Sequence, residues 1–267
     1  MVKLLIVDFV EPDMRIATVI QRTGLRTIQA GLLALAAGGA MAQAPDQDAA
    51  AAAPPPPRPL LLLLQPAPFN HPDKAGAGIG VVDVTLKVPD VQVGADTALL
   101  QLPLVLEQGE TVAVTLKELT VRDSHGNVPL ATRDVKGPDG KLREWTSPRE
   151  VQGDLVVHYQ APVEPPPPKR RAAAPADATP GPTLPPPATS ALRAERGGLA
   201  VAGNALVLLP PDGRQYPVSV RWDLSKLGDD AIASSSAGDG DVLLPMGAPS
   251  RLWSATFTIT LPKRASN

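Results

Sequence analysis

The chain has 267 residues, among them 32 Pro and 22 Gly but only 3 Phe, 3 Trp and 2 Tyr. With 25 Lys and Arg against 27 Asp and Glu, its net charge is −2, so the whole chain lacks the basic excess of a nucleic-acid-binding protein. Cysteine is absent, which excludes disulfide scaffolds, thiolate zinc sites, iron–sulfur clusters and a cysteine nucleophile.

Residues 1–44 predict a secretory signal peptide. Arg15, Arg22 and Arg26 precede an apolar run, 30–37, that leads into small residues. This order of basic, apolar and small residues is typical of signal peptides. The alternative is a membrane anchor, which needs about 20 apolar residues, and the run is shorter. We therefore favour a cleaved signal.

The cleavage site and the start codon follow from the same segment. Cleavage after Ala42 or Ala44 satisfies the small-x-small rule. The acidic residues before Met14 do not suit a signal peptide, so Met14 is the expected true start. The mature protein is then expected to be periplasmic or secreted, in a bacterium.

Two proline-rich tracts follow. Residues 45–72 predict a disordered or polyproline-type tether. Its leucine run, 60–64, is too short for a helix and indicates an extended segment laid along a hydrophobic surface. The second tract, 162–187, has 11 prolines in 26 residues and suits neither a buried strand nor a helix. The tract either separates two small domains or forms a disordered insertion, 162–190, within one domain, and we favour the insertion.

The remaining segments alternate apolar and polar residues with the period of a strand that has one buried face. The predicted strands are 79–88, 98–106, 111–121, 154–160, 205–209, 216–222 and 252–261. Pro103 marks its segment as an edge or bent strand. Hairpin-type turn sequences occur at 123–127, 138–140 and 211–213. The chain therefore predicts an all-β fold, an antiparallel β-sandwich over 73–261, followed by a tail, 262–267.

The motifs yield no candidate catalytic, cofactor-binding or metal-binding residue. His71, His125 and His158 lack metal-ligand spacing and are interpreted as a tether residue, a turn residue and an exposed strand residue. Residues 234–238 lack the first glycine of a nucleophile elbow. Residues 239–241 offer calcium two carboxylates without the other ligands of a calcium loop, so an acidic loop is favoured. Nucleotide-binding glycine motifs are also missing, and no cofactor is expected.

Several short stretches point to a family when they are taken together. They are 143–146 (REWT), 153–159 (GDLVVHY), 196–199 (RGGL) leading to 206–210 (LVLLP), 218–224 (VSVRWDL) and 233–238 (ASSSAG). In order and spacing they resemble the amino-terminal β-domain of the glycyl aminopeptidase family of bacterial periplasmic zinc peptidases. The resemblance covers 79–257.

That resemblance also limits what can be transferred. Family members carry a His-Glu-x-x-His zinc site in a thermolysin-like helical domain that follows this region, and the present sequence contains no such motif. No zinc ligand or catalytic glutamate can therefore be assigned. Under the resemblance Trp145, Tyr159 and Trp222 are interpreted as residues that pack in the core or at a domain interface.

Two functional hypotheses follow. In the first, the chain is an exported, non-catalytic β-sandwich that binds or scaffolds an envelope or periplasmic protein, with no nucleic-acid partner and no membrane span after signal cleavage. In the second, it is part of a truncated zinc aminopeptidase whose catalytic domain is missing from this chain, either encoded nearby or lost. Both predict that this chain alone hydrolyses no peptide. The second also predicts an exposed apolar patch where the catalytic domain docked.

Overall fold

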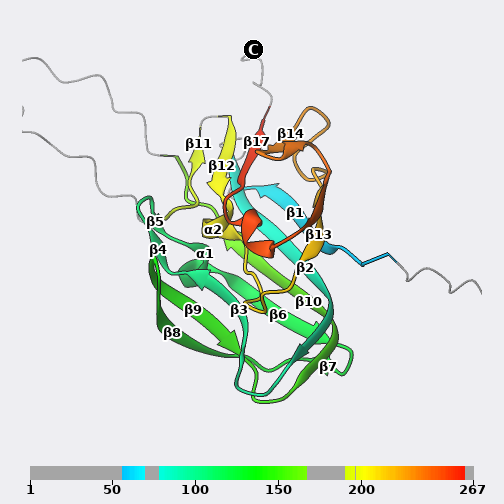
Figure 1. Ribbon diagram of the computed structural model, residues 1–267. Coiled ribbons are helices and arrows are strands. Elements are labelled where there is room, and N and C mark those ends of the chain that lie inside the picture. The colour runs from blue at the N-terminus through cyan, green and yellow to red at the C-terminus, as the bar shows by residue number, and fades with distance from the viewer. Residues whose placement is uncertain (1–55, 70–77, 167–189, 196, 262–267) are drawn as a thin grey trace, which may run out of the picture. The chain divides into compact units, whose positions relative to one another are not determined.

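The computed structural model describes residues 56–69, 78–166, 190–195 and 197–261 (Figure 1). These residues belong to one compact unit. The predicted signal peptide, its alternative start at Met14, His71, most of the proline-rich insertion and the tail lie outside the described residues. No helix in the described part is long and apolar enough to cross a membrane.

The largest sheet has seven strands in the order β16-β13-β1-β2-β10-β6-β7 (Figure 1). Their bounds are β1 Leu60–Pro68, β2 Ile79–Val93, β6 Lys117–Asp123, β7 Gly126–Asn127, β10 Val151–Pro162, β13 Tyr216–Trp222 and β16 Val242–Gly247. Buried and half-buried residues alternate along β1, as a strand with one core face requires. The sheet therefore has a core face and an outer face.

Smaller sheets and single helical turns make up the rest. The five-stranded sheet, in the order β11-β12-β17-β14-β15, comprises β11 Ala194–Glu195, β12 Gly198–Ala202, β17 Thr256–Thr260, β14 Ile232–Ser235 and β15 Gly238–Asp239. The three-stranded sheet, in the order β3-β9-β8, comprises β3 Ala98–Pro103, β9 Gly140–Thr146 and β8 Ala131–Gly137. The remaining elements are β4 Val105–Leu106, β5 Gly109–Glu110, α1 Val112–Thr115, α2 Gly203–Leu206 and the 3-10 turn η2 Pro249–Leu252. The predicted all-β class is confirmed.

The leucine run corrects the predicted tether. Residues 60–68 form β1, which lies between β2, its antiparallel neighbour, and β13, its parallel neighbour. Leu60, Leu62 and Leu64 are fully buried, and burial of each such side chain contributes about 2 kcal/mol. The prolines at 59, 66 and 68 stand just before the strand or toward its end, so they leave the central ladder intact. The β1–β13 pair is parallel, whereas the other strand pairs of these sheets are antiparallel.

Three predicted strands begin as helical turns instead. One of them, 252–261, is strand only from Thr256, because Leu252 still belongs to η2. In 111–121 the chain forms α1 and then β6, because the Thr111 hydroxyl caps the turn by accepting from the Ala113 N–H at 3.2 Å. In 205–209 it forms the end of α2 and then a single bridge from Leu209 to Gln101. Short apolar runs fit either period, so the sequence pattern did not separate them.

The predicted turns met different outcomes. Residues 123–127 join β6 to β7 and residues 138–140 join β8 to β9, each as a hairpin. Gly126 and Gly140 have φ values of 105° and 134°, which glycine adopts readily. The turn at 211–213 joins no paired strands, so the third hairpin prediction is wrong. Pro103 ends β3, an edge strand as predicted.

The described ends of the second proline-rich tract meet each other. The Glu164 N–H donates to the Leu192 carbonyl at 2.8 Å, and Arg193 Nη2 lies 2.9 Å from Glu164 Oε2. The chain thus leaves β10 and returns at nearly the same place on this compact unit.

Tyr159 ties the large sheet to α2. Its fully buried hydroxyl donates to the Leu206 carbonyl at 2.6 Å and accepts from the Leu208 N–H at 3.3 Å, and burial raises the pKa of Tyr159. Trp145 is also buried, and half-buried Trp222 meets Phe257 edge-on at 6.1 Å. The interpretation of these three aromatic residues as packing residues is confirmed.

Replacement of Tyr159 by phenylalanine is expected to lower the free energy of unfolding by about 1–2 kcal/mol, because two buried backbone groups lose their partner. Urea unfolding of Tyr159→Phe and wild type measures the difference. Tyr216→Phe is the control, since that hydroxyl donates to part-buried Asp212 at 2.8 Å and its loss should cost less. Coincident unfolding curves for Tyr159→Phe and wild type would refute the expectation.

Candidate functional site

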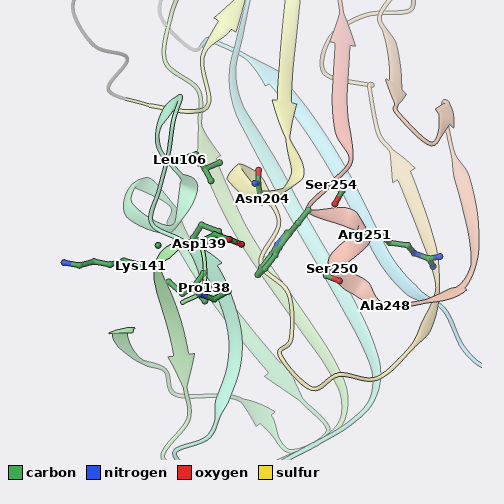
Figure 2. A pocket seen from close by; sticks show the side chains of 13 residues that line it. Leu106, Pro138, Asp139, Lys141, Asn204, Ala248, Ser250, Arg251 and Ser254 are labelled. Carbon is green, nitrogen blue, oxygen red and sulfur yellow. The ribbon is translucent and has the colours of Figure 1, made fainter. Parts of the chain in front are cut away.

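A cleft of about 550 Å³ lies where four separate stretches of the chain come together. One wall is the β8–β9 hairpin at 138–142 together with Pro103 and Leu106, and the other is α2, η2 and the residues after η2 (Figure 2). Most of its lining is apolar surface from proline, leucine and tryptophan side chains. We take this cleft as the candidate site.

The hairpin wall is fixed by backbone hydrogen bonding. The Leu104 N–H donates to the Lys141 carbonyl at 2.9 Å, which holds the hairpin against the segment between β3 and β4. Asp139 and Lys141 are exposed at the rim, and the Lys141 side chain extends away from the other lining residues (Figure 2). The rim therefore carries one charge of each sign.

The opposite wall depends on a close approach between two helical turns. The Gly203 N–H donates to the Ala255 carbonyl at 2.8 Å, and the Asn204 N–H donates to the Trp253 carbonyl at 3.2 Å. A Cβ atom on Gly203 would lie 1.7 Å from the Leu252 carbonyl oxygen. Only glycine fits at this position, so Gly203 sets the distance between α2 and η2.

Trp253 forms part of the cleft with one edge anchored to the protein. Its indole Nε1–H donates to the Val207 carbonyl at 2.8 Å, and the side chain is half-buried. The hydrogen bond fixes the orientation of the ring, while the rest of the ring lines the cleft. A large, oriented aromatic surface of this kind binds apolar groups at low conformational cost.

Asn204 supplies the polar feature of the cleft. Its Oδ1 atom is buried and accepts no hydrogen bond within the described part of the chain, although Asn204 lines the cleft. A buried acceptor without a donor costs about 1–3 kcal/mol. Because Oδ1 has almost no solvent-accessible surface, an occupant that presents an N–H recovers this energy only when the Asn204 side chain turns Oδ1 toward it.

Arg251 lines the cleft but points elsewhere. Figure 2 shows its guanidinium directed away from the hairpin wall, where Nη2 donates to the Tyr216 carbonyl at 3.0 Å and also to the Pro245 carbonyl. Burial lowers the pKa of Arg251. This arginine fastens η2 to the large sheet, so the charge available to a ligand comes from the rim.

The polar residues singled out in the sequence lie away from the cleft lining. His125 is exposed in the β6–β7 turn, with Nδ1 3.8 Å from Asp123 Oδ2. His158 is half-buried, not fully exposed as expected, and its Nδ1 lies 3.2 Å from Thr85 Oγ1. Within the described residues, no group of three or more His, Asp or Glu side chains could hold a metal ion.

The two loop segments singled out near the end of the chain have structural partners. Ser235 Oγ donates to the Gly238 carbonyl at 3.3 Å inside the β14–β15 hairpin. Asp241 Oδ1 accepts from the Trp222 N–H at 2.9 Å. Sequence reasoning did not single out Trp253, Asn204 or Gly203. Of the cleft residues, only Pro103 and the 138–140 turn had a recognisable signal.

Comparison with known proteins gives limited similarity. No family model matches the sequence, and no curated protein matches it. Among solved structures, the chain is similar to an aminopeptidase N family protein from Idiomarina loihiensis, with a TM-score of 0.43 and 11% sequence identity. The similarity covers 75% of this chain and 29% of that protein, so this chain spans less than a third of that protein's length.

Proposed function

We propose that this protein is an exported, non-catalytic β-sandwich module that binds another protein through the Trp253 cleft. The observation that carries the proposal is the combination of an oriented, half-buried indole with the buried, unpartnered Oδ1 atom of Asn204 in one apolar cleft. The signal-like residues 1–44 support export. The partner is then an envelope or periplasmic protein.

The dimensions of the cleft indicate what part of a partner enters it. A volume of about 550 Å³ is in the range of small binding pockets and holds a few side chains. We infer an extended peptide segment that places an apolar side chain against Trp253 and a backbone N–H toward Asn204 Oδ1. The exposed charges of Asp139 and Lys141 would favour one direction of the segment.

Peptide selection tests this function. Full-length protein is panned against a phage-displayed library of random peptides, and selected peptides are measured by fluorescence anisotropy. We expect apolar sequences whose affinity falls about tenfold or more in Trp253→Ala, because a buried aromatic anchor contributes about 2 kcal/mol. Asn204→Leu should also weaken binding, since it removes the acceptor.

Two controls separate binding from folding. Trp253→Phe keeps an aromatic ring and should bind better than Trp253→Ala. Lys136→Ala changes an exposed residue of β8 outside the cleft lining and should bind as wild type does. The proposal fails if no peptide is selected, or if selected peptides bind Trp253→Ala and wild type equally while both proteins remain folded.

A second candidate function is the amino-terminal domain of a glycyl aminopeptidase-like enzyme whose catalytic domain is missing from this chain. Two large apolar residues favour a docked domain here: Val105 is 59% exposed and Val114 is 42% exposed, on β4 and α1, and Val105 adjoins cleft residue Leu106. This function predicts binding of a hydrophobic dye that Val105→Ser and Val114→Ser reduce. Release of amino-terminal glycine by the purified chain with zinc would contradict both functions.

A further inference from the structure

The outer face of the seven-stranded sheet is a second surface with an ordered pattern. Strand pairing places one row of side chains across five strands: Ser219, Leu61, Lys87, Val156 and Arg122. The next row is Arg221, Leu63, Thr85, His158 and Thr120. These residues are half-buried or exposed, whereas their neighbours along each strand are mostly buried in the core. We call this surface the outer face.

Aliphatic side chains lie in the middle of the outer face. Leu61 and Leu63 on β1 and Val156 on β10 are half-buried. The solvent side of an antiparallel sheet normally carries polar residues. Packing within the domain does not explain the three aliphatic residues here. Contact with a partner would give these side chains the cover that the domain itself does not.

Cations flank these aliphatic residues, one on every second strand. Arg221 on β13, Lys87 on β2 and Arg122 on β6 are exposed, and none of them has an ion pair or side-chain hydrogen bond within the described part of the chain. Adjacent strands are about 4.8 Å apart. Lys87 and Arg122 are therefore roughly 10 Å apart in one row, with Val156 between them. Arg221 lies a similar distance from Lys87 across the strands but two residues farther along, in the row of Leu63.

The acidic residues on this side of the sheet already have partners. Asp154 Oδ2 accepts from Arg58 Nη1 at 2.7 Å, and Asp83 Oδ2 lies 3.0 Å from Lys226 Nζ. Asp223 accepts from the Gln65 side chain at 2.7 Å. Within the described residues none of the three cations forms an ion pair with a carboxylate, so they are available to an anionic partner.

A shallow hollow joins the two kinds of residue. It has a volume of about 410 Å³, and its lining includes Leu61, Lys87, Val156 and Arg221 together with the Arg58–Asp154 ion pair at its edge. A ligand seated there touches aliphatic and cationic groups together. A phosphate or other small anion would leave the aliphatic groups uncovered.

We propose that the outer face binds an acidic polypeptide segment whose carboxylates are about 10 Å apart with aliphatic side chains between them. An α-helix presents this pattern when acidic residues recur about every seven positions, a rise of about 10.5 Å, and leucines lie midway on the same side. The leucines then face Leu61 and Val156 and the carboxylates face Lys87 and Arg122, all in one row, while a further carboxylate reaches Arg221 in the next row. This site is separate from the Trp253 cleft and does not depend on the function proposed for it.

Fluorescence anisotropy tests the pairing directly. The probe is a dye-labelled helical peptide with glutamate at that spacing and leucine midway, titrated with full-length protein at low salt. A scrambled peptide of equal composition is the reference. We expect tighter binding of the patterned peptide, and Lys87→Glu should raise its Kd about tenfold or more, because one attraction becomes a repulsion. Added NaCl should raise the Kd further.

Matched variants decide the outcome. Lys136→Glu reverses an exposed lysine on β8 and should change the Kd less than about twofold. Lys87→Gln, which removes charge without reversing it, should lie between wild type and Lys87→Glu. Trp253→Ala should leave the Kd unchanged, which separates this site from the cleft.

Three results would overturn the proposal. The first is equal binding of patterned and scrambled peptides, and the second is equal loss in Lys136→Glu and Lys87→Glu. The third comes from competition. Phosphatidylglycerol vesicles or duplex DNA would displace the peptide at a lower concentration of negative charge than polyglutamate needs. That third result would make the outer face a phosphate-binding surface.

Discussion

Gly203→Ala is expected to lower the free energy of unfolding by about 3 kcal/mol or more, at the upper end of overpacking effects. Helix propensity alone predicts the opposite sign, since alanine is about 1 kcal/mol better than glycine inside a helix. The added methyl would lie 1.7 Å from the Leu252 carbonyl oxygen and 2.8 Å from its carbonyl carbon. Because both contacts are with backbone, a side-chain rotation cannot relieve them.

Moving α2 away from η2 would also change the shape of the cleft. The Asn204 N–H to Trp253 carbonyl hydrogen bond crosses the same junction, so Gly203→Ala should weaken peptide binding in molecules that still fold. Gly94→Ala is the control, since its Cβ would have only Thr97 Oγ1 nearby, at 3.7 Å. Urea unfolding of the two variants measures the difference. Equal urea midpoints for Gly203→Ala and Gly94→Ala would show that the contact between α2 and η2 can relax to accommodate the methyl group.

Arg149→Ala is expected to destabilise the protein by about 3 kcal/mol at neutral pH, because it leaves a buried carboxylate without its cation. The Asp123 side chain has no exposed surface. Its oxygens accept from Arg149 Nη1 at 2.7 Å and Nη2 at 2.9 Å, and from the His125 and Gln152 N–H groups at 2.9 and 3.3 Å. The Arg149 hydrogen bonds are the largest cause of a pKa of Asp123 far below its ordinary value.

The effect should depend on pH with a definite sign. Because the pKa of Asp123 is lowered on folding, its contribution to stability is fully present above the ordinary carboxyl pKa of about 4 and is lost as the pH falls below it. Wild type and Arg149→Ala should therefore converge in stability in acid. Arg133→Ala breaks a more exposed pair with Glu144 and should cost less than about 1 kcal/mol. Thermal unfolding from pH 7 down to about pH 3 tests this, and a pH-independent gap would refute it.

The parts of the fold that depend on residues close together in the sequence could be predicted. The turns at 123–127 and 138–140 carry their own glycines, and the alternation in 79–88 and 154–160 is a direct record of one buried face. The extended conformation predicted for the leucine run 60–64 is confirmed, but the assignment of the run to a tether is wrong, because its composition resembles low complexity. Its strand partner β13 is far away in sequence, so local pattern could not show that β1 is a central strand.

The cleft was unpredictable for a related reason. Trp253 becomes a ligand-facing residue only because its Nε1–H meets the Val207 carbonyl, and Asn204 matters only because its Oδ1 is enclosed. Gly203 looks like an ordinary small residue until the Leu252 carbonyl is placed beside it. Each of these facts depends on how distant stretches pack, and a single sequence carries no local mark of it.

The parallel pairing of β1 with β13 has a consequence for how the protein is made. Gln65, at the end of this pairing, bonds to Asp223, 158 residues later, so β1, an inner strand of the large sheet, lacks one neighbour until most of the chain has been synthesised. Contacts between such distant segments form slowly. Until then five consecutive leucines stand at an open strand edge, which is an aggregation hazard. We therefore expect a chaperone that holds unfolded chains to raise the yield of folded protein. The increase should be largest when the chaperone is present before β13 pairs with β1.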